Sequence, residues 1–241
     1  MSATTTISTT LADCFDRIAI INLPSRADRR REMRTELSRL GLEPSPGHID
    51  FFPAVRVADV ADWPSLGARG CFLSHYTVLK AARDAGLRSV LVIEDDCCFT
   101  PELVQRQAEV AGLLSGDDWD LVHLGHVEAA EGTGGLLRPW DQPVMTAHLY
   151  AVHRNVLDRL VKYLEQVLQR PNGHPEGGPQ HYDGALCMFR EQNPDVRTWI
   201  AAPNLARQRS SRSDIHGRWW DRAPVIRTAV NLLRKARRLT K

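Results

Sequence analysis

Residues 89–96 read Ser-Val-Leu-Val-Ile-Glu-Asp-Asp, a short apolar run that ends in three acidic residues. An unbroken run of Val, Leu and Ile predicts a strand buried on both faces, as in a parallel sheet. Because it is costly to take an ionised carboxylate out of water, we expect the acids at the carboxyl edge of the sheet, where open α/β sheets bind ligands. Carboxylates crowded there need a cation between them, and a hard divalent metal is the simplest candidate.

The rest of the chain alternates buried-type strands with helical segments. The alternation predicts an α/β fold with a mostly parallel sheet flanked by helices. Strands are expected at 17–23, 48–55, 89–96, 120–125, 146–152 and 196–201, and helices at about 28–40, 71–85, 100–114, 155–169 and 183–190.

Composition limits the protein class. The chain has 241 residues, 43% of them hydrophobic, and a net charge of +2, which fits one globular domain and excludes a disordered chain. No stretch reaches the roughly 20 apolar residues of a membrane span. The five cysteines include an adjacent pair and show no metal-ligand spacing among themselves, so we expect reduced thiols and a cytoplasmic protein.

The two ends of the chain differ from its middle. Residues 1–16 begin Ser/Thr-rich without the features of a secretory signal and are expected to be a disordered leader, followed by the main domain at 17–218. Residues 219–241 form a basic amphipathic tail, with seven basic residues and one acid in 221–241. Such a tail can lie on an anionic membrane surface at the inner face of the membrane, or dock on the domain as a terminal helix. It could also bind nucleic acid, but the near-neutral body argues against that, and no nucleic-acid partner is expected.

The acidic trio Glu94, Asp95 and Asp96 is the first candidate site. A divalent cation held by one or two carboxylates keeps positions open for phosphate oxygens and can stabilise a diphosphate leaving group. These are the requirements of a nucleotide-diphosphate-sugar. The alternative is a solvated acidic turn that follows a strand.

A glycine-rich segment, Gly67–His75, is the second candidate. Glycines before a helix allow backbone N–H groups to approach an anion, and Gly70, Ser74 and His75 could contact a nucleotide. The chain has neither a P-loop nor a dinucleotide fingerprint. The alternative for His75 is a satisfied histidine in the core or on the helix surface.

The third candidate follows the first expected strand. Asn22, Arg26 and Arg29 come at its carboxyl end, on the edge where Asp96 should emerge, and arginine can bind phosphate bidentately. The alternative is the solvated face of a charged helix.

Together, these motifs resemble glycosyltransferase family 25, which includes bacterial lipooligosaccharide galactosyltransferases and is similar to procollagen galactosyltransferases. The resemblance covers about residues 17–216. It rests on the order and spacing of the following segments: Ile20–Leu23, Arg29–Arg30, Gly67–His75, Ile93–Asp96, Thr146–Tyr150, Asp183, Pro203, Gln208 and Ser213–Ile215.

The resemblance implies a GT-A-like fold and inverting transfer of a hexose such as galactose from a UDP-sugar, with Mn²⁺ or Mg²⁺. In that case Glu94 and Asp96 hold the metal, with His216 as a third ligand, and Asp95 joins the nucleotide-binding residues. Asp183 is the expected base for the acceptor hydroxyl, or else a simple helix N-cap. The acceptor would be a lipopolysaccharide-type or other surface glycan or glycolipid. The main rival is a catalytically inactive relative that binds a glycan or a nucleotide.

Overall fold

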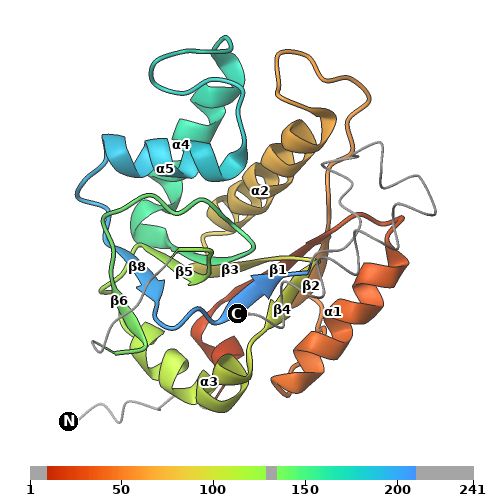
Figure 1. Ribbon diagram of the computed structural model, residues 1–241, viewed down its shortest axis with the longest axis vertical. Coiled ribbons are helices and arrows are strands. Elements are labelled where there is room, and N and C mark those ends of the chain that lie inside the picture. The colour runs from red at the N-terminus through yellow and green to blue at the C-terminus, as the bar shows by residue number, and fades with distance from the viewer. Residues whose placement is uncertain (1–9, 129–134, 210–241) are drawn as a thin grey trace, which may run out of the picture. The chain divides into compact units, whose positions relative to one another are not determined.

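The structure is a computed structural model, and it describes residues 10–128 and 135–209 (Figure 1). The chain divides into two units, Met1–Arg209 and Ser210–Lys241, and the fold concerns the first. His216 and the tail predicted at 219–241 lie outside the described residues.

A single mixed sheet forms the centre of the first unit. Seven of its strands follow the order β2-β1-β3-β7-β5-β8-β6, while β9 pairs with both β4 and β5. The strands of the described residues are β1 (Arg17–Asn22), β2 (Ile49–Pro53), β3 (Ser89–Glu94), β4 (Cys97–Phe99), β5 (Leu121–Gly125), β6 (Leu137–Pro139), β7 (Leu149–His153), β8 (Thr198–Ala201) and β9 (Ala206–Gln208).

Helices cover both faces of this sheet. Figure 1 shows α2, α4 and α5 on one side and α1 and α3 on the other. The helices are the 3-10 turn η1 (Leu11–Cys14), α1 (Ala27–Arg39), α2 (Leu66–Asp84), α3 (Pro101–Leu114), α4 (Arg154–Gln169) and α5 (Tyr182–Gln192).

Alternate residues of β3 enter two separate cores. Leu91 and Ile93 pack in the core that contains η1, α1 and α3, whereas Val90 and Val92 pack with α2, α4 and α5. All four side chains are at most 1% exposed. The strand predicted at 89–96 is therefore confirmed as a strand buried on both faces, although it ends at Glu94. The predicted α/β class is also confirmed.

The sheet is less parallel than the alternation of helices and strands suggested. Strand β1 is parallel to β2 and β3, and β5 is parallel to β8, but β7 runs antiparallel between β3 and β5. The segment between β6 and β7 contains no helix, and it leads into β7 at the edge of the sheet where β1 and β3 end. The short strands β4, β6 and β9, three residues each, were not predicted because so few residues show no period.

Helix α2 begins earlier than predicted. The glycine segment was expected to form a loop before a helix at 71–85, but α2 starts at Leu66, and the Ser65 hydroxyl caps it by accepting from the Ala68 N–H at 3.0 Å. Gly67 and Gly70 are thus helical and do not form a loop before the helix.

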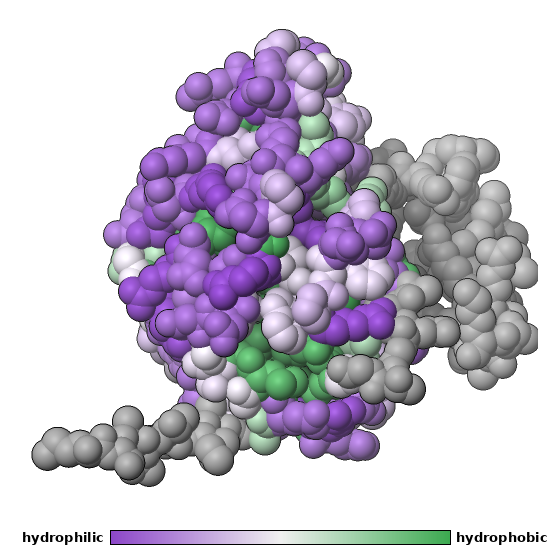
Figure 2. All heavy atoms as spheres, turned by 90° about the vertical axis from the view of Figure 1, so that its left-hand side faces the viewer, coloured by the Kyte–Doolittle hydropathy of each residue, from purple (hydrophilic) through white to green (hydrophobic). Residues whose placement is uncertain are grey.

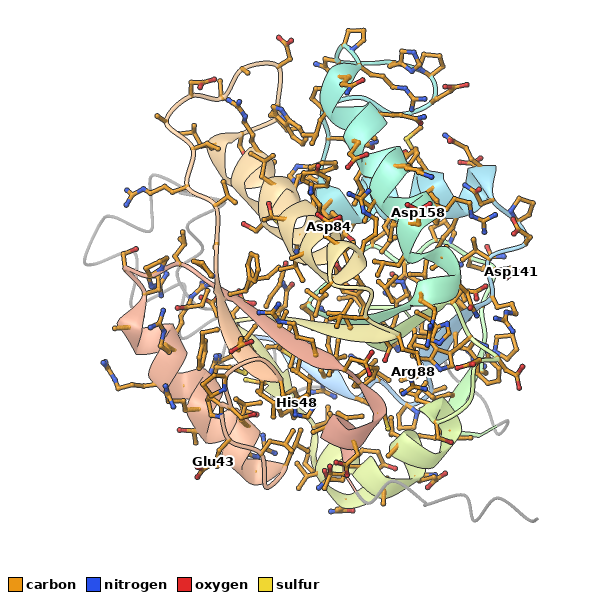
Figure 3. The ribbon with its side chains drawn as sticks, turned by 180° about the vertical axis from the view of Figure 1, so that it is seen from behind. Glu43, His48, Asp84, Arg88, Asp141 and Asp158 are labelled. Atoms are coloured by element: carbon orange, nitrogen blue, oxygen red, sulfur yellow. The ribbon has the colours of Figure 1, made fainter. Side chains whose placement is uncertain are left out.

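The leader predicted for 1–16 is wrong for its last part. Leu11 and Phe15 are buried in the core, at 1% and 2% exposure. His48 and Arg88, labelled in Figure 3, bind the backbone of this segment. His48 Nε2 lies 3.0 Å from the Phe15 carbonyl oxygen, and Arg88 Nη2 donates to the Cys14 carbonyl at 3.1 Å. Residues 1–9 lie outside the described part of the chain.

The surface of the face shown in Figure 2 is mostly hydrophilic, with one hydrophobic patch in its lower half. Among the helices of the described residues, none combines the length and the apolar character needed to cross a membrane.

Candidate active site

The site lies where β1 and β3 end side by side. The two strands are parallel, so Asn22 and Glu94 emerge at the same edge of the sheet, and the Asp95 N–H donates to the Ile21 carbonyl at 3.2 Å. The acidic trio is therefore at the carboxyl edge next to Asn22, as the sequence predicted.

Asp95 is held by two partners. Arg29 Nη1 donates to Oδ1 at 2.7 Å and Asn22 Nδ2 donates to Oδ2 at 2.7 Å. Asp95 is 6% exposed, Arg29 9% and Asn22 1%. Asp95 thus forms a buried, charge-compensated anchor for the turn that follows β3, and its carboxylate already has its partners.

Asp96, the next residue, is in the opposite situation. Its Oδ1 atom is buried and has no hydrogen-bond partner among the described residues, and Arg29 Nη1 is 3.5 Å from Oδ2. Burial, followed by the negative charge of Glu94, raises the pKa of Asp96 to about 7. A carboxylate this poorly compensated fits a cation, because buried polar atoms normally have a partner.

Glu94 lies between Asp96 and helix α2. Its Oε2 accepts from Gln208 Nε2 at 2.6 Å, and its Oε1 is 3.3 Å from His75 Nε2. Burial opposes ionisation of Glu94, but the hydrogen bonds with His75 and Gln208 and the nearby histidines lower its pKa below the usual value. Cys71 Sγ also lies 3.9 Å from Oε1, and burial, with the charge of Glu94, raises the pKa of the thiol.

Two tyrosines connect His75 with α5. His75 Nδ1 lies 3.0 Å from the Tyr150 hydroxyl, which donates to the Tyr182 hydroxyl at 2.9 Å. The His75 ring stacks on Tyr182 with centroids 4.2 Å apart. Helix α5 therefore starts against the acidic edge of the sheet.

Asp183 is in the first turn of α5, directly after Tyr182. Its Oδ1 accepts from the Gly184 N–H at 2.8 Å, and its charge contributes to the raised pKa of the Cys71 thiol. Asp183 is therefore near enough to Cys71 for its charge to act on the thiol. The N-cap of α5 is His181, so the simple N-cap alternative for Asp183 does not apply.

Comparisons with known proteins agree with this picture. A protein of Aedes aegypti named "Glycosyltransferase 25 family member" is 26% identical over 227 residues, covering 78% of this chain and 35% of that protein. Human "Procollagen galactosyltransferase 2" is 31% identical over 136 residues, covering 46% of this chain and 21% of its own length. Human "Inactive glycosyltransferase 25 family member 3" is 28% identical over 155 residues, covering 51% and 25%. No family model matches the chain.

A solved structure has the same fold. It is a glycosyltransferase "involved in the glycosylation of the major capsid of PBCV-1", with a TM-score of 0.50 and 15% identity over 82% of this chain and 94% of that one. The curated relatives support glycosyltransferase family 25, and the solved structure supports the fold. The resemblance seen in the motifs is confirmed, and the chain spans about a third or less of the length of these curated relatives.

Two residues of the family 25 motif G-x-x-G-C-x-x-S-H have internal roles here. Ser74 is 1% exposed, and its hydroxyl donates to the Gly70 carbonyl at 2.6 Å and accepts from the Val55 N–H at 2.8 Å. A Cβ atom on Gly70 would come within 2.9 Å of the Val55 carbonyl oxygen. Both residues hold the chain after β2 against α2, whereas the sequence suggested that they contact a nucleotide.

The arginines predicted after the first strand have different partners. Arg29 enters the site, and Arg30 Nε donates to Asn22 Oδ1 at 3.1 Å. Arg26 pairs with Asp28 at 2.8 Å at the start of α1, although its carbonyl oxygen accepts from Asn22 Nδ2 at 3.3 Å. His216, predicted as a third metal ligand, lies outside the described residues.

Some site residues had no role in the sequence prediction. Tyr150 and Tyr182 orient His75. Arg209, expected from the sequence to help cover a diphosphate, binds the acidic turn by donating to the Asp95 carbonyl at 2.7 Å and, through its own N–H, to the Asp96 carbonyl at 2.8 Å. The position of Cys71 four residues before His75 is the one signal that could have added the thiol, because residues at this spacing share a helix face.

Proposed function

We propose that this protein is a metal-dependent inverting glycosyltransferase, which moves a hexose, galactose or a related sugar, from a UDP-sugar to a hydroxyl group of a lipopolysaccharide-type or other surface glycan. The observation that carries this proposal is the buried Oδ1 atom of Asp96, which has no partner among the described residues at the edge where Asn22 and Glu94 meet. The family 25 relatives support the choice of reaction and of a nucleotide-sugar donor.

Asp96, with Glu94 beside it, would hold the Mn²⁺ or Mg²⁺ ion, and His216 is a candidate for a further ligand. When bound, such an ion supplies positive charge to the diphosphate leaving group. The protein's own contribution is to fix the turn that carries Asp96: Arg29 and Asn22 hold Asp95 from one side, and Arg209 holds the backbone from the other.

Asp183 is our candidate for the base in this reaction. Inverting transfer needs a carboxylate within hydrogen-bond reach of the acceptor hydroxyl, to take its proton as the new bond forms. Asp183 is partly buried, and its charge acts on the Cys71 thiol, which lies 3.9 Å from Glu94 Oε1. Helix α5 carries it, so the acceptor would approach from the α5 side while the donor binds over β1 and β3.

The acceptor and the place of action follow from the same proposal. A lipid-linked glycan would bring the enzyme to the inner face of a membrane, and residues 219–241 supply basic residues and tryptophans suited to an anionic surface. Flotation of the full chain with vesicles that contain an anionic lipid tests this, with vesicles of neutral lipid as the control.

The second candidate function is an inactive family 25 member that keeps donor or glycan binding. It is favoured by the human relative whose name describes it as inactive. The two candidates differ in turnover: the active enzyme should release UDP slowly from its donor even without acceptor, whereas the inactive relative should bind but release none.

The deciding experiment measures thermal stability and UDP release with a panel of UDP-sugars, with and without Mn²⁺. Ligand binding to the native state raises the melting temperature. We expect a donor that stabilises the wild type only with Mn²⁺ and releases UDP, and no such effect in Asp96→Asn. Asp158→Asn, a change on α4 (Figure 3), is the matched control. Equal stabilisation and turnover in Asp96→Asn would contradict the proposal.

A further inference from the structure

Three side chains beside the acidic edge bring different metal-binding atoms together. Cys71 Sγ, His75 and a carboxylate oxygen of Glu94 all lie within 4.8 Å of one another. Among residues 10–128 and 135–209, this is the group of at least three His, Cys, Asp or Glu side chains that converges in this way. The thiol and the imidazole have no part in the transfer reaction proposed above.

The secondary structure explains why the three meet. Cys71 and His75 are four residues apart on α2, so their side chains lie on the same face one turn apart. Glu94 ends β3, and the side chains of α2 pack on β3 in the core that contains Phe72 and Val92. Two ligands therefore come from one rigid helix and the third from the end of a central strand.

The distances approach those of a tetrahedral zinc site. Zn–N and Zn–O bonds of about 2.0 Å and a Zn–S bond of about 2.3 Å imply about 3.3 Å between nitrogen and oxygen and about 3.5 Å between sulfur and oxygen. The structure has 3.3 Å from His75 Nε2 to Glu94 Oε1 and 3.9 Å from Cys71 Sγ to the same oxygen. The nitrogen–oxygen distance already matches, the sulfur–oxygen distance is about 0.4 Å too long, and all three ligand atoms lie within 4.8 Å of one another.

Contacts with two tyrosines already fix the orientation of the His75 ring. The Tyr150 hydroxyl lies 3.0 Å from Nδ1, and Tyr182 stacks on the ring, so that Nε2 faces Glu94. His75 is 1% exposed. A hydrogen bond at the second ring nitrogen is the usual support of a histidine that binds metal, because it sets the tautomer and the ring orientation.

We propose that Cys71, His75 and Glu94 form a binding site for a thiophilic divalent cation, with Zn²⁺ as the ion that suits this ligand set. A thiolate and an imidazole favour Zn²⁺ over the harder Mn²⁺ and Mg²⁺, and three protein ligands leave a fourth position for water. The ion displaces the thiol proton of Cys71, which is released to solvent. The site goes beyond the proposed transfer reaction but shares Glu94 with it, so bound Zn²⁺ lowers the affinity of Asp96 for a second cation.

Co²⁺ is the probe that tests this site in the full chain. A thiolate bound to Co²⁺ produces a sulfur-to-metal charge-transfer band in the near ultraviolet, which a site made of oxygen ligands lacks. We expect this band to saturate at one Co²⁺ per chain, to disappear on addition of equimolar Zn²⁺, and to be lost in Cys71→Ser. Cys98→Ser changes another partly buried thiol, on β4, and should keep the band.

Two further variants separate this site from the proposed donor site. Tyr150→Phe removes the hydroxyl at His75 Nδ1 and should weaken Co²⁺ binding about 10- to 100-fold while the ligands remain. Asp96→Asn should keep the band, whatever it does to UDP release. Circular dichroism checks that each variant is folded.

The absence of a charge-transfer band from the wild type at saturating Co²⁺ would overturn the proposal. So would an unchanged band in Cys71→Ser, because another thiol would then be responsible. Loss of the band in folded Asp96→Asn would overturn the separation of the two sites. None of these readouts depends on sugar transfer, so a failed transferase assay leaves the result on Cys71 intact.

Discussion

Asp95 and Asp96 are adjacent in the chain and lie at the same edge of the sheet, yet their carboxylates have different surroundings. We call Asp95 with Arg29 and Asn22 the Asp95 half of this edge, and Asp96 with Glu94 the Asp96 half. The Asp95 half is complete, because Arg29 and Asn22 satisfy both carboxylate oxygens in a buried setting. The Asp96 half is incomplete, because a buried oxygen has no partner among the described residues and Glu94 adds like charge. The difference indicates that the first half holds the turn in place and the second is available to a ligand.

The largest effect on stability is expected from removing the Asp95 carboxylate. Asp95→Ala leaves Arg29 buried without its main anionic partner, and we expect the free energy of unfolding to fall by about 3–5 kcal/mol. Urea denaturation measures this. Asp158→Ala, which removes an exposed partner of Lys162 on α4, should change stability little. A loss below about 1 kcal/mol in Asp95→Ala would contradict the anchoring role.

Asp96→Asn should have the opposite effect on stability, with a defined pH dependence. The folded pKa of about 7 lies above the ordinary value of 3.8, so the wild type loses stability as the pH rises from about 4 to about 7. The variant avoids this loss and should be more stable by at least about 1.4 kcal/mol at pH 8, and by less at pH 4. Urea titrations at the two pH values measure the difference.

The effect of Mn²⁺ on stability provides a second comparison between the wild type and Asp96→Asn. If Asp96 binds the ion, Mn²⁺ should raise the stability of the wild type at pH 8 and leave Asp96→Asn unchanged. A matching response in both proteins would place the ion elsewhere.

Tyr150→Phe tests how strongly α5 is tied to the edge. The variant removes a buried hydroxyl that links His75 with Tyr182, and we expect a stability loss of about 1–2 kcal/mol. Thermal or urea unfolding measures this. No change would mean that stacking alone holds the His75 ring.

The smallest effect is expected from Ser74→Ala. The Ser74 hydroxyl bonds only to backbone groups at Gly70 and Val55 among the contacts described, so we expect a loss of about 1 kcal/mol and unchanged affinity for UDP. Calorimetry with UDP and Mn²⁺ compares the two proteins. A strong loss of affinity in a stable variant would restore the nucleotide contact predicted from the sequence.

The fold was predictable where the chain repeats a local pattern. The apolar run before Glu94 predicted a strand buried on both faces, and Thr100 followed by Pro101 located the start of α3. The start of α2 was misplaced because Gly67 and Gly70 are poor helix formers, but Ser65 caps the helix before them and the Val55 carbonyl leaves no room for a Cβ atom at Gly70. The direction of β7 depends on which strands it pairs with, and no local pattern encodes that.

The sequence predicted where the candidate site lies better than it predicted what each residue does there. Parallel strands bring Asn22 and the acidic trio to one edge, which the sequence order already implied. The separate fates of Asp95 and Asp96 depend on Arg29, which arrives from α1 and lies closer to one carboxylate than to the other. The difference between the two acids arises from tertiary packing, so the sequence alone does not distinguish them.

The reversed direction of β7 has a consequence for how specificity can diverge in this fold. Because β7 enters the sheet from the edge that carries the acidic turn, the Glu94 N–H donates to the His148 carbonyl at 3.0 Å, and the chain from Trp140 to His148 leads directly to that turn. Insertions or deletions in that stretch can remodel the surroundings of the acidic turn while every helical crossover keeps its length. In the proposed transferase, acceptor preference can therefore change without a change in the scaffold.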